Sequence, residues 1–283
     1  MSLVVNTNMG SQIAQRNLFN AGNTVNTTMQ RLSSGLRINS ASDDAAGLSL
    51  SKKISSQVTA SDVAKSNAQT GINMIQTAES DLAVIQDNLQ RMRDLSVQAA
   101  NGVYSSSERR MLNTEFSNRL SEIDRIAKSS KFSSIDLLNA TPSGLNLQVG
   151  TDATANDRVD ISGVFGNFQV TTSGSRLSSL AGASINITTA ATARTMISTV
   201  SGAISAVSTA RSLMGATINR LQGAISRVDT RKQNMSAALS VIQDADIAVE
   251  SANLTRTQIL KQAAVAMLSQ ANQTPQMALN LLQ

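Results

Sequence analysis

Apolar side chains in residues 197–242 recur at alternating spacings of three and four, with polar residues between them. Twelve of the fourteen positions in this series are apolar, and no proline interrupts it. A seven-residue repeat held this long is typical of one helix with a narrow apolar stripe, roughly 70 Å in length at 1.5 Å per residue. The positions are Ile197, Val200, Ile204, Val207, Arg211, Met214, Ile218, Leu221, Ile225, Val228, Lys232, Met235, Leu239 and Ile242.

A second stripe with the same spacing runs from Ala64 to Ala99. Burying one large apolar side chain stabilises a fold by about 1.5–3 kcal/mol, so each stripe requires a partner along its length. The stripes alone allow either a parallel or an antiparallel pairing. Our fold prediction is a mainly α protein: a long antiparallel helical bundle or coiled-coil rod, with a small β-hairpin region in the middle of the chain. The positions are Ala64, Ala68, Gly71, Ile75, Ala78, Leu82, Ile85, Leu89, Met92, Ser96 and Ala99.

Three further helices are indicated by weaker patterns. Residues 1–40 carry a thin apolar stripe interrupted at Gly35, and 39–44 are dense in capping residues, so we place a boundary there. Asp43 and Asp44 are interpreted as a helix cap rather than a catalytic carboxylate pair. Ser105 and Glu108 have the spacing of a capping box, which predicts a short helix after 105. A helical pattern continues after 242, and Pro275 is expected to end or kink it at Thr274.

The middle of the chain changes period. Leu145, Leu147 and Val149 alternate with polar residues, turn-forming residues follow, and Val159 and Ile161 alternate again. This pattern predicts a β-hairpin.

The composition excludes several kinds of chemistry. The chain has no Cys and no His, so disulfides, thiolate or imidazole metal sites and Cys–His nucleophile pairs are ruled out. Aromatic residues make up only 2% of the chain, whereas enzyme pockets usually use more. We therefore expect no enzyme activity, no catalytic residues, no metal and no cofactor.

The net charge of +5 is spread along the chain, with no basic stripe interleaved with aromatic residues. We expect no binding to nucleic acid, and keep a basic helical nucleic-acid-binding module only as an alternative. The first residues lack the basic and apolar regions of a secretory signal, and no apolar run is long enough to insert into a membrane.

Several long blocks of the chain together resemble bacterial flagellin. The similar blocks are Gln15–Leu18, Arg31–Leu48, Gln90–Gly102, Gly215–Ala216, Asn219–Leu221, Gln262–Ala263, Gln270–Gln273 and Leu281–Leu282. The resemblance implies a subunit that self-polymerises into the helical flagellar filament for swimming motility. The alternative within the same class is a hook–filament junction protein.

The resemblance also implies a domain organisation. Residues 1–42 and 245–283 would form the filament core, with their helices folding on assembly. Residues 43–192 and 193–244 would form an outer rod, in which 141–192 are a short variable segment in place of large outer domains. The subunit would act outside the cell, in the flagellum, after export without a cleaved signal peptide.

The resemblance implies partners as well. A secretion chaperone would bind the C-terminal helix, and junction and cap proteins would meet the filament. A Toll-like innate immune receptor would contact Arg91, Leu95 and Glu115, although Asp94 and Ser96 depart from the family's usual residues. Leu95 itself could be a shoulder of the core or an exposed contact, and Glu115 could pair with Arg119 one helical turn away.

We predict a set of apolar positions, termed the assembly seam, through which the helices of the filament pack. Arg211 and Lys232 interrupt the first stripe; they could extend their charged heads to water, or fix the register of the helices. The assembly seam comprises Ile197, Val200, Ile204, Ile218, Leu221, Ile225, Leu239, Leu260 and Met267.

Overall fold

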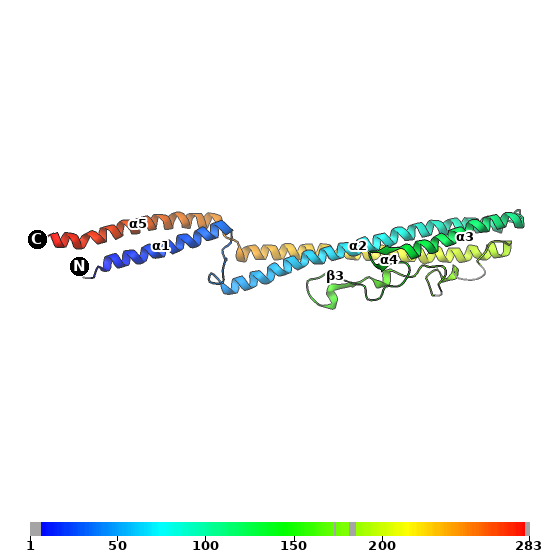
Figure 1. Cartoon of the computed structure of the whole chain (residues 1–283), viewed down its shortest axis with the longest axis horizontal. Coiled ribbons are helices and arrows are strands. Elements are labelled where there is room, and N and C mark those ends of the chain that lie inside the picture. Colours follow the sequence, from blue (N-terminus) through cyan, green and yellow to red (C-terminus); the bar gives the residue numbers. More distant parts are fainter. Residues whose placement is uncertain (1–6, 173, 181–184, 281–283) are drawn as a thin grey trace. The chain divides into compact units, whose positions relative to one another are not determined.

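The computed structural model describes residues 7–172, 174–180 and 185–280, with side chains up to Gln273, and is mostly helical (Figure 1). The described part contains two small antiparallel sheets, β1 (Lys131–Phe132) with β2 (Ile135–Asp136) and β3 (Asn146–Gln148) with β4 (Arg158–Asp160). The prediction of a mainly α fold with a small hairpin region is confirmed. No helix in these described segments is long and apolar enough to cross a membrane. The long helices are α1 (Met9–Ser34), α2 (Ala45–Ala100), α3 (Ser106–Ser129), α4 (Ala190–Gln243) and α5 (Ile247–Asn280).

The chain packs as two units. Unit 1 comprises Met1–Val58 and Gln233–Gln283, and unit 2 comprises Thr59–Lys232. Unit 1 is therefore built from both ends of the chain, and unit 2 from the sequence between them.

In unit 2, α2 and α4 pack antiparallel, a direction that the stripes left open. Lys232 Nζ lies 2.5 Å from Asp62 Oδ1, whereas Arg211 Nη2 lies 2.8 Å from Glu79 Oε1. Along this pair of contacts the residue numbers of α4 fall as those of α2 rise, so the two helices run in opposite directions. Glu115 of α3 pairs with Arg91 of α2. Arg119, further along α3, donates to Asn88, which lies earlier in α2, so helix α3 returns along α2 in the same way.

The 64–99 stripe forms the centre of this packing on α2. On α4 the buried face combines part of the 197–242 stripe with small residues beside it, such as Ala203, Ala210 and Ala224. All eleven positions of the 64–99 stripe are buried, and all fourteen positions of the 197–242 stripe are buried or half-buried. Helix α3 adds Phe116, Ile123 and Ala127 to the core of unit 2. Because α2 is covered by more than one helix, it buries a wider face than a narrow stripe, and Leu95 is fully buried with the rest.

The predicted caps are present. Asp44 Oδ1 accepts the backbone N–H of Gly47 at 2.9 Å at the start of α2, as expected for a cap. Ser105 and Glu108 form a complete capping box at the start of α3. Helix α2 ends shortly before this box, at Ala100.

The predicted hairpin is β3–β4, in which Leu147 pairs with Val159. A second hairpin, β1–β2, was missed, because strands of two residues are too short to show an alternating pattern. The chain beyond β4 contributes Phe165, Phe168 and Ile187 to the core of unit 2 without forming further strands in the described residues.

In unit 1, α1 and α5 lie side by side, and we call them the terminal helix pair (Figure 1). Helix α1 ends at Gly35, whose φ of 70° is the left-handed conformation that glycine adopts without strain. Helix α5 runs through Pro275 to Asn280, so the alternative in which the helix ends at Thr274 is wrong, and a kink there stays a prediction. A proline removes one backbone hydrogen bond and favours a bend, which a long helix can tolerate.

Candidate functional site

The terminal helix pair is held at both ends by polar contacts between α1 and α5. Near one end, Asn8 Nδ2 donates to the carbonyl oxygen of Ala271 at 2.7 Å, while Asn8 Oδ1 caps α1 by accepting the N–H of Ser11. Near the other end, Arg31 Nη1 lies 3.2 Å from Glu250 Oε1, and the Glu250 side chain is only 11% exposed. These contacts set the two helices antiparallel.

The segments between the helices of unit 1 are also joined by backbone hydrogen bonds. The N–H of Arg37 donates to Gln243 O at 2.7 Å, and the N–H of Ala245 donates to Gly35 O at 2.9 Å. The Arg37 guanidinium adds a bond to Ile242 O at 2.6 Å. The point where α1 ends is thereby tied to the point where α4 ends.

Despite these contacts, the terminal helix pair leaves much apolar surface in water. Ile13 and Phe19 of α1 are 50% and 68% exposed, and Leu260 and Met267 of α5 are 55% and 63% exposed. Each of these side chains is at least half exposed, so each gains stability when another surface covers it.

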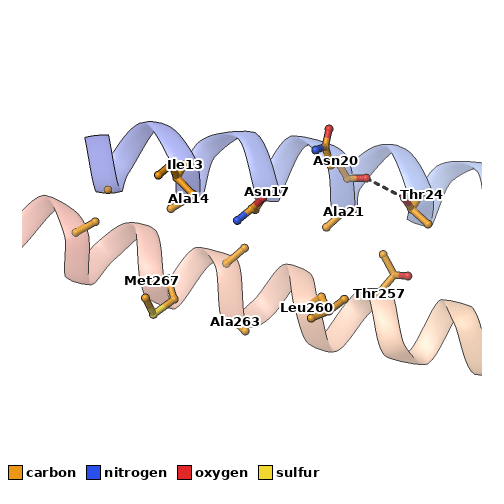
Figure 2. A pocket seen from close by; sticks show the side chains of 13 residues that line it. Ile13, Ala14, Asn17, Asn20, Ala21, Thr24, Thr257, Leu260, Ala263 and Met267 are labelled. Atoms are coloured by element: carbon orange, nitrogen blue, oxygen red, sulfur yellow. Dashed lines mark hydrogen bonds between the residues drawn. The ribbon is translucent and has the colours of Figure 1, made fainter. Parts of the chain in front are cut away.

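A groove of about 710 Å³ lies between α1 and α5 (Figure 2). Small side chains such as Ala14, Ala21 and Ala263 leave the space open, and Ile13, Leu260 and Met267 line it. None of the residues that line it is charged. The groove therefore offers apolar and amide surface for an uncharged side chain, and no group for acid–base chemistry.

The structure gives the residues of the predicted assembly seam different environments. Leu260 and Met267 come together in the groove. On α4, Val200 and Leu221 are buried in the core of unit 2. Ile197, Ile204, Ile218, Ile225 and Leu239 are half-buried. The part that any of them takes in assembly stays a prediction.

The two charged residues of the first stripe both bind carboxylates of α2. Arg211 donates to Glu79 at 2.8 Å and to Gln86 at 2.9 Å. Lys232 lies 2.5 Å from Asp62. The side chains of Arg211 and Lys232 are 34% and 35% exposed, so their charged heads lie at the edge of the helix packing and pair there with α2.

Arg91 and Glu115 form a bidentate ion pair on the surface between α2 and α3. Arg91 Nε lies 2.8 Å from Glu115 Oε1, and Arg91 Nη2 lies 3.1 Å from Oε2. The hydrogen bond from Arg91 lowers the pKa of Glu115, and Arg119 at 3.8 Å reinforces it, as the helical spacing predicted. Leu95 does not join this surface because it is fully buried.

Phe19 is a residue that the sequence analysis missed. It lies off the apolar pattern of residues 1–40, so periodicity assigned it no role. A signal was nevertheless present, since the chain has only five Phe, one Tyr and no Trp, and Phe19 is the only aromatic residue before Tyr104.

Comparison with known proteins covers nearly the whole chain. Residues 5–143 match the family model of the bacterial flagellin N-terminal helical region, and 197–282 match that of the C-terminal helical region. The chain is 38% identical to the flagellar filament 33 kDa core protein of Treponema phagedenis over 99% of this chain and 100% of that protein. It is 40% identical to the flagellin of Halalkalibacterium halodurans over the same shares.

The fold is also similar to a solved structure. A Vibrio parahaemolyticus protein assigned as a flagellar hook-associated protein superposes with a TM-score of 0.55, at 16% identity, over 71% of this chain and 99% of that one. At this identity the likeness concerns the fold alone.

Proposed function

Because this chain belongs to the bacterial flagellin family, we propose that it polymerises with copies of itself into a helical filament through its terminal helix pair. Flagellins form the flagellar filament outside the cell, so the chain is a structural subunit of that filament and not an enzyme. Its part in swimming motility follows from that filament.

One observation carries the proposal of self-polymerisation: the exposed apolar surface of the terminal helix pair. Phe19, Leu260 and Met267 are each more than half exposed in the single chain. Burying one such side chain is worth about 1.5–3 kcal/mol, so neighbouring subunits that cover these faces gain stability. The contact is heterologous and does not close, because a closed contact would give a dimer or ring instead of a filament.

The proposed organisation has residues 1–42 and 245–283 in the filament core, and residues 43–192 and 193–244 in an outer rod. The breaks between helices support these bounds, since α1 ends at Ser34, α2 begins at Ala45, and α4 ends at Gln243. The core helices fold fully only on assembly, because a pair of helices that leaves large side chains such as Phe19, Leu260 and Met267 more than half exposed is marginal by itself.

Three further partners belong to this proposal. A secretion chaperone covers the C-terminal helix before export; support comes from Ile259, Leu260 and Val265 of α5, all more than half exposed. Cap and junction proteins meet the filament ends by covering the same kind of surface.

Electron microscopy of seeded, purified chain, with circular dichroism before and after seeding, tests self-polymerisation. We expect long filaments and a gain in helix. A chain lacking residues 1–40 should keep the fold of unit 2 and fail to polymerise. Long filaments from that truncated chain would refute the role of the terminal helix pair, and a full-length chain that stays monomeric would favour the junction protein.

A second candidate function is recognition by a Toll-like innate immune receptor through Arg91 and Glu115. The observation in its favour is that both charged groups lie at the surface, where their side chains are 49% and 35% exposed. Leu95 contributes to the core beneath this surface instead of contacting the receptor directly. A receptor reporter assay with Arg91→Ala and Glu115→Ala should show weaker signalling than Arg125→Ala, a control at another exposed ion pair of α3.

A further inference from the structure

Phe19 is an isolated apolar side chain on an otherwise polar helix face. None of the residues one and two turns away on the same face has a large apolar side chain; they are Gln12, Gln15, Arg16, Gly22, Asn23 and Asn26. Phe19 itself is 68% exposed, whereas Phe116, Phe165 and Phe168 are fully buried. Leaving a phenyl ring in water forgoes the largest apolar burial that a side chain of α1 could provide.

The groove of the terminal helix pair lies on the other side of α1. Asn17, Asn20 and Ala21 line the groove (Figure 2). Phe19 follows Asn17 by two residues, which is about 200° around a helix of 3.6 residues per turn. The ring of Phe19 therefore cannot enter the groove of its own chain.

We infer that Phe19 of one subunit inserts into the α1–α5 groove of a neighbouring copy of this chain. The groove has a volume of about 710 Å³, and no charged residue lines it. Ile13, Leu260 and Met267 supply apolar walls, and methionine sulfur packs favourably against aromatic rings. An uncharged, mainly apolar groove suits a phenyl ring and disfavours a charged side chain, because no opposite charge there would offset its desolvation.

The opposite placement of ring and groove gives this contact a direction. Each subunit offers its ring on one face of α1 and receives a ring on the other face, so the contact joins different surfaces of the two copies. Such a contact can repeat without closing, and it generates a chain of subunits and not a two-fold dimer. The inference rests on the proposed self-polymerisation and assigns it a specific pair of surfaces.

The critical concentration for seeded polymerisation tests this inference. Removing the ring in Phe19→Ala should raise it by about 10- to 100-fold, the effect of one buried aromatic side chain on an association constant. Phe19→Leu should fall between this variant and the unaltered chain. The matched control is Val103→Ala, which removes a side chain that is 85% exposed in unit 2 and should change the critical concentration by less than about twofold.

Photo-crosslinking makes the test independent of folding defects. With p-benzoylphenylalanine in place of Phe19, seeded filaments should yield intersubunit crosslinks to peptides containing residues 257–271 or 10–24. The same probe in place of Val103 should not reach those peptides. Crosslinks from position 19 only to other regions, or a crosslinked species that stops at a dimer, would overturn the inference.

The outcomes also distinguish the insertion of Phe19 from the proposed self-polymerisation on which it rests. If the unaltered chain does not polymerise on seeds, self-polymerisation fails. If the unaltered chain polymerises and Phe19→Ala has the same critical concentration, polymerisation stands and the insertion of Phe19 is wrong.

Discussion

Replacing Leu89 by alanine tests whether the inner face of α2 is as tightly packed as its burial implies. Leu89 is 0% exposed and belongs to the core of unit 2. Leucine-to-alanine changes at such sites cost about 2.7–5 kcal/mol, because apolar burial is lost and a cavity remains. For a unit of this size, 1 kcal/mol shifts the melting temperature by about 2–4 °C, so Leu89→Ala should lower it by about 5–20 °C.

The assay is thermal unfolding of the unpolymerised chain, followed by far-ultraviolet circular dichroism. Val84→Ala is the control, because Val84 lies on the same helix and is 49% exposed. It should shift the transition by no more than about 2 °C, since exposed substitutions change stability by roughly 0.5 kcal/mol or less. Equal shifts for the two variants would refute the view that α2 buries one continuous face against α3 and α4.

Three other substitutions test local features. Between pH 6 and pH 3, the free energy of unfolding measured with urea should fall less for Glu115→Gln than for the unaltered chain. The pKa of Glu115 is lowered in the folded state, so the ionised carboxylate stabilises the fold above the usual glutamate pKa. That stabilisation is lost as the pH falls through the folded-state pKa. An equal loss of unfolding free energy in both chains on acidification would argue against a stabilising Arg91–Glu115 ion pair. Arg211→Met should cost about 1 kcal/mol at low salt and less at high salt, because it removes the contacts to Glu79 and Gln86; a cost that does not change with salt would argue against an ionic contribution. Gly35→Ala should destabilise unit 1 by about 1 kcal/mol because of its positive φ, whereas Gly22→Ala inside α1 should stabilise it by a few tenths of a kcal/mol or more, and the same sign for both would contradict the left-handed cap.

Local patterns were sufficient to predict the long helices and several of their ends, but not the end of α5 beyond Pro275. The spacing of apolar residues in 64–99 and 197–242 reflects the 3.6-residue turn, and it persists whatever the partner, so α2 and α4 were predictable. Caps such as Asp44 and the Ser105–Glu108 box involve residues within four positions of one another, so they too are predictable from the sequence. The β3–β4 hairpin was predictable because its strands alternate over several residues, whereas the two-residue strands β1 and β2 offer no period.

The way in which the helices pack against one another could not be predicted from the sequence pattern. The sequence pattern does not show whether α2 and α4 are parallel or antiparallel, because both directions bury the same stripes. The antiparallel direction is visible only in contacts between the helices, such as Asp62–Lys232. Leu95 had two open interpretations, and the packing around α2 placed it in the core.

The sequence by itself determined that this is a helical, cysteine-free chain with long apolar stripes and the motifs of a flagellin, because composition and period are properties of the chain alone. Only the tertiary structure decided which apolar residues remain outside. Leu95 and Phe19 are both large apolar residues that lie off the predicted stripes, yet one is fully buried and the other is 68% exposed. Burial depends on what packs against a side chain, and that is set by the three-dimensional arrangement of elements distant in sequence.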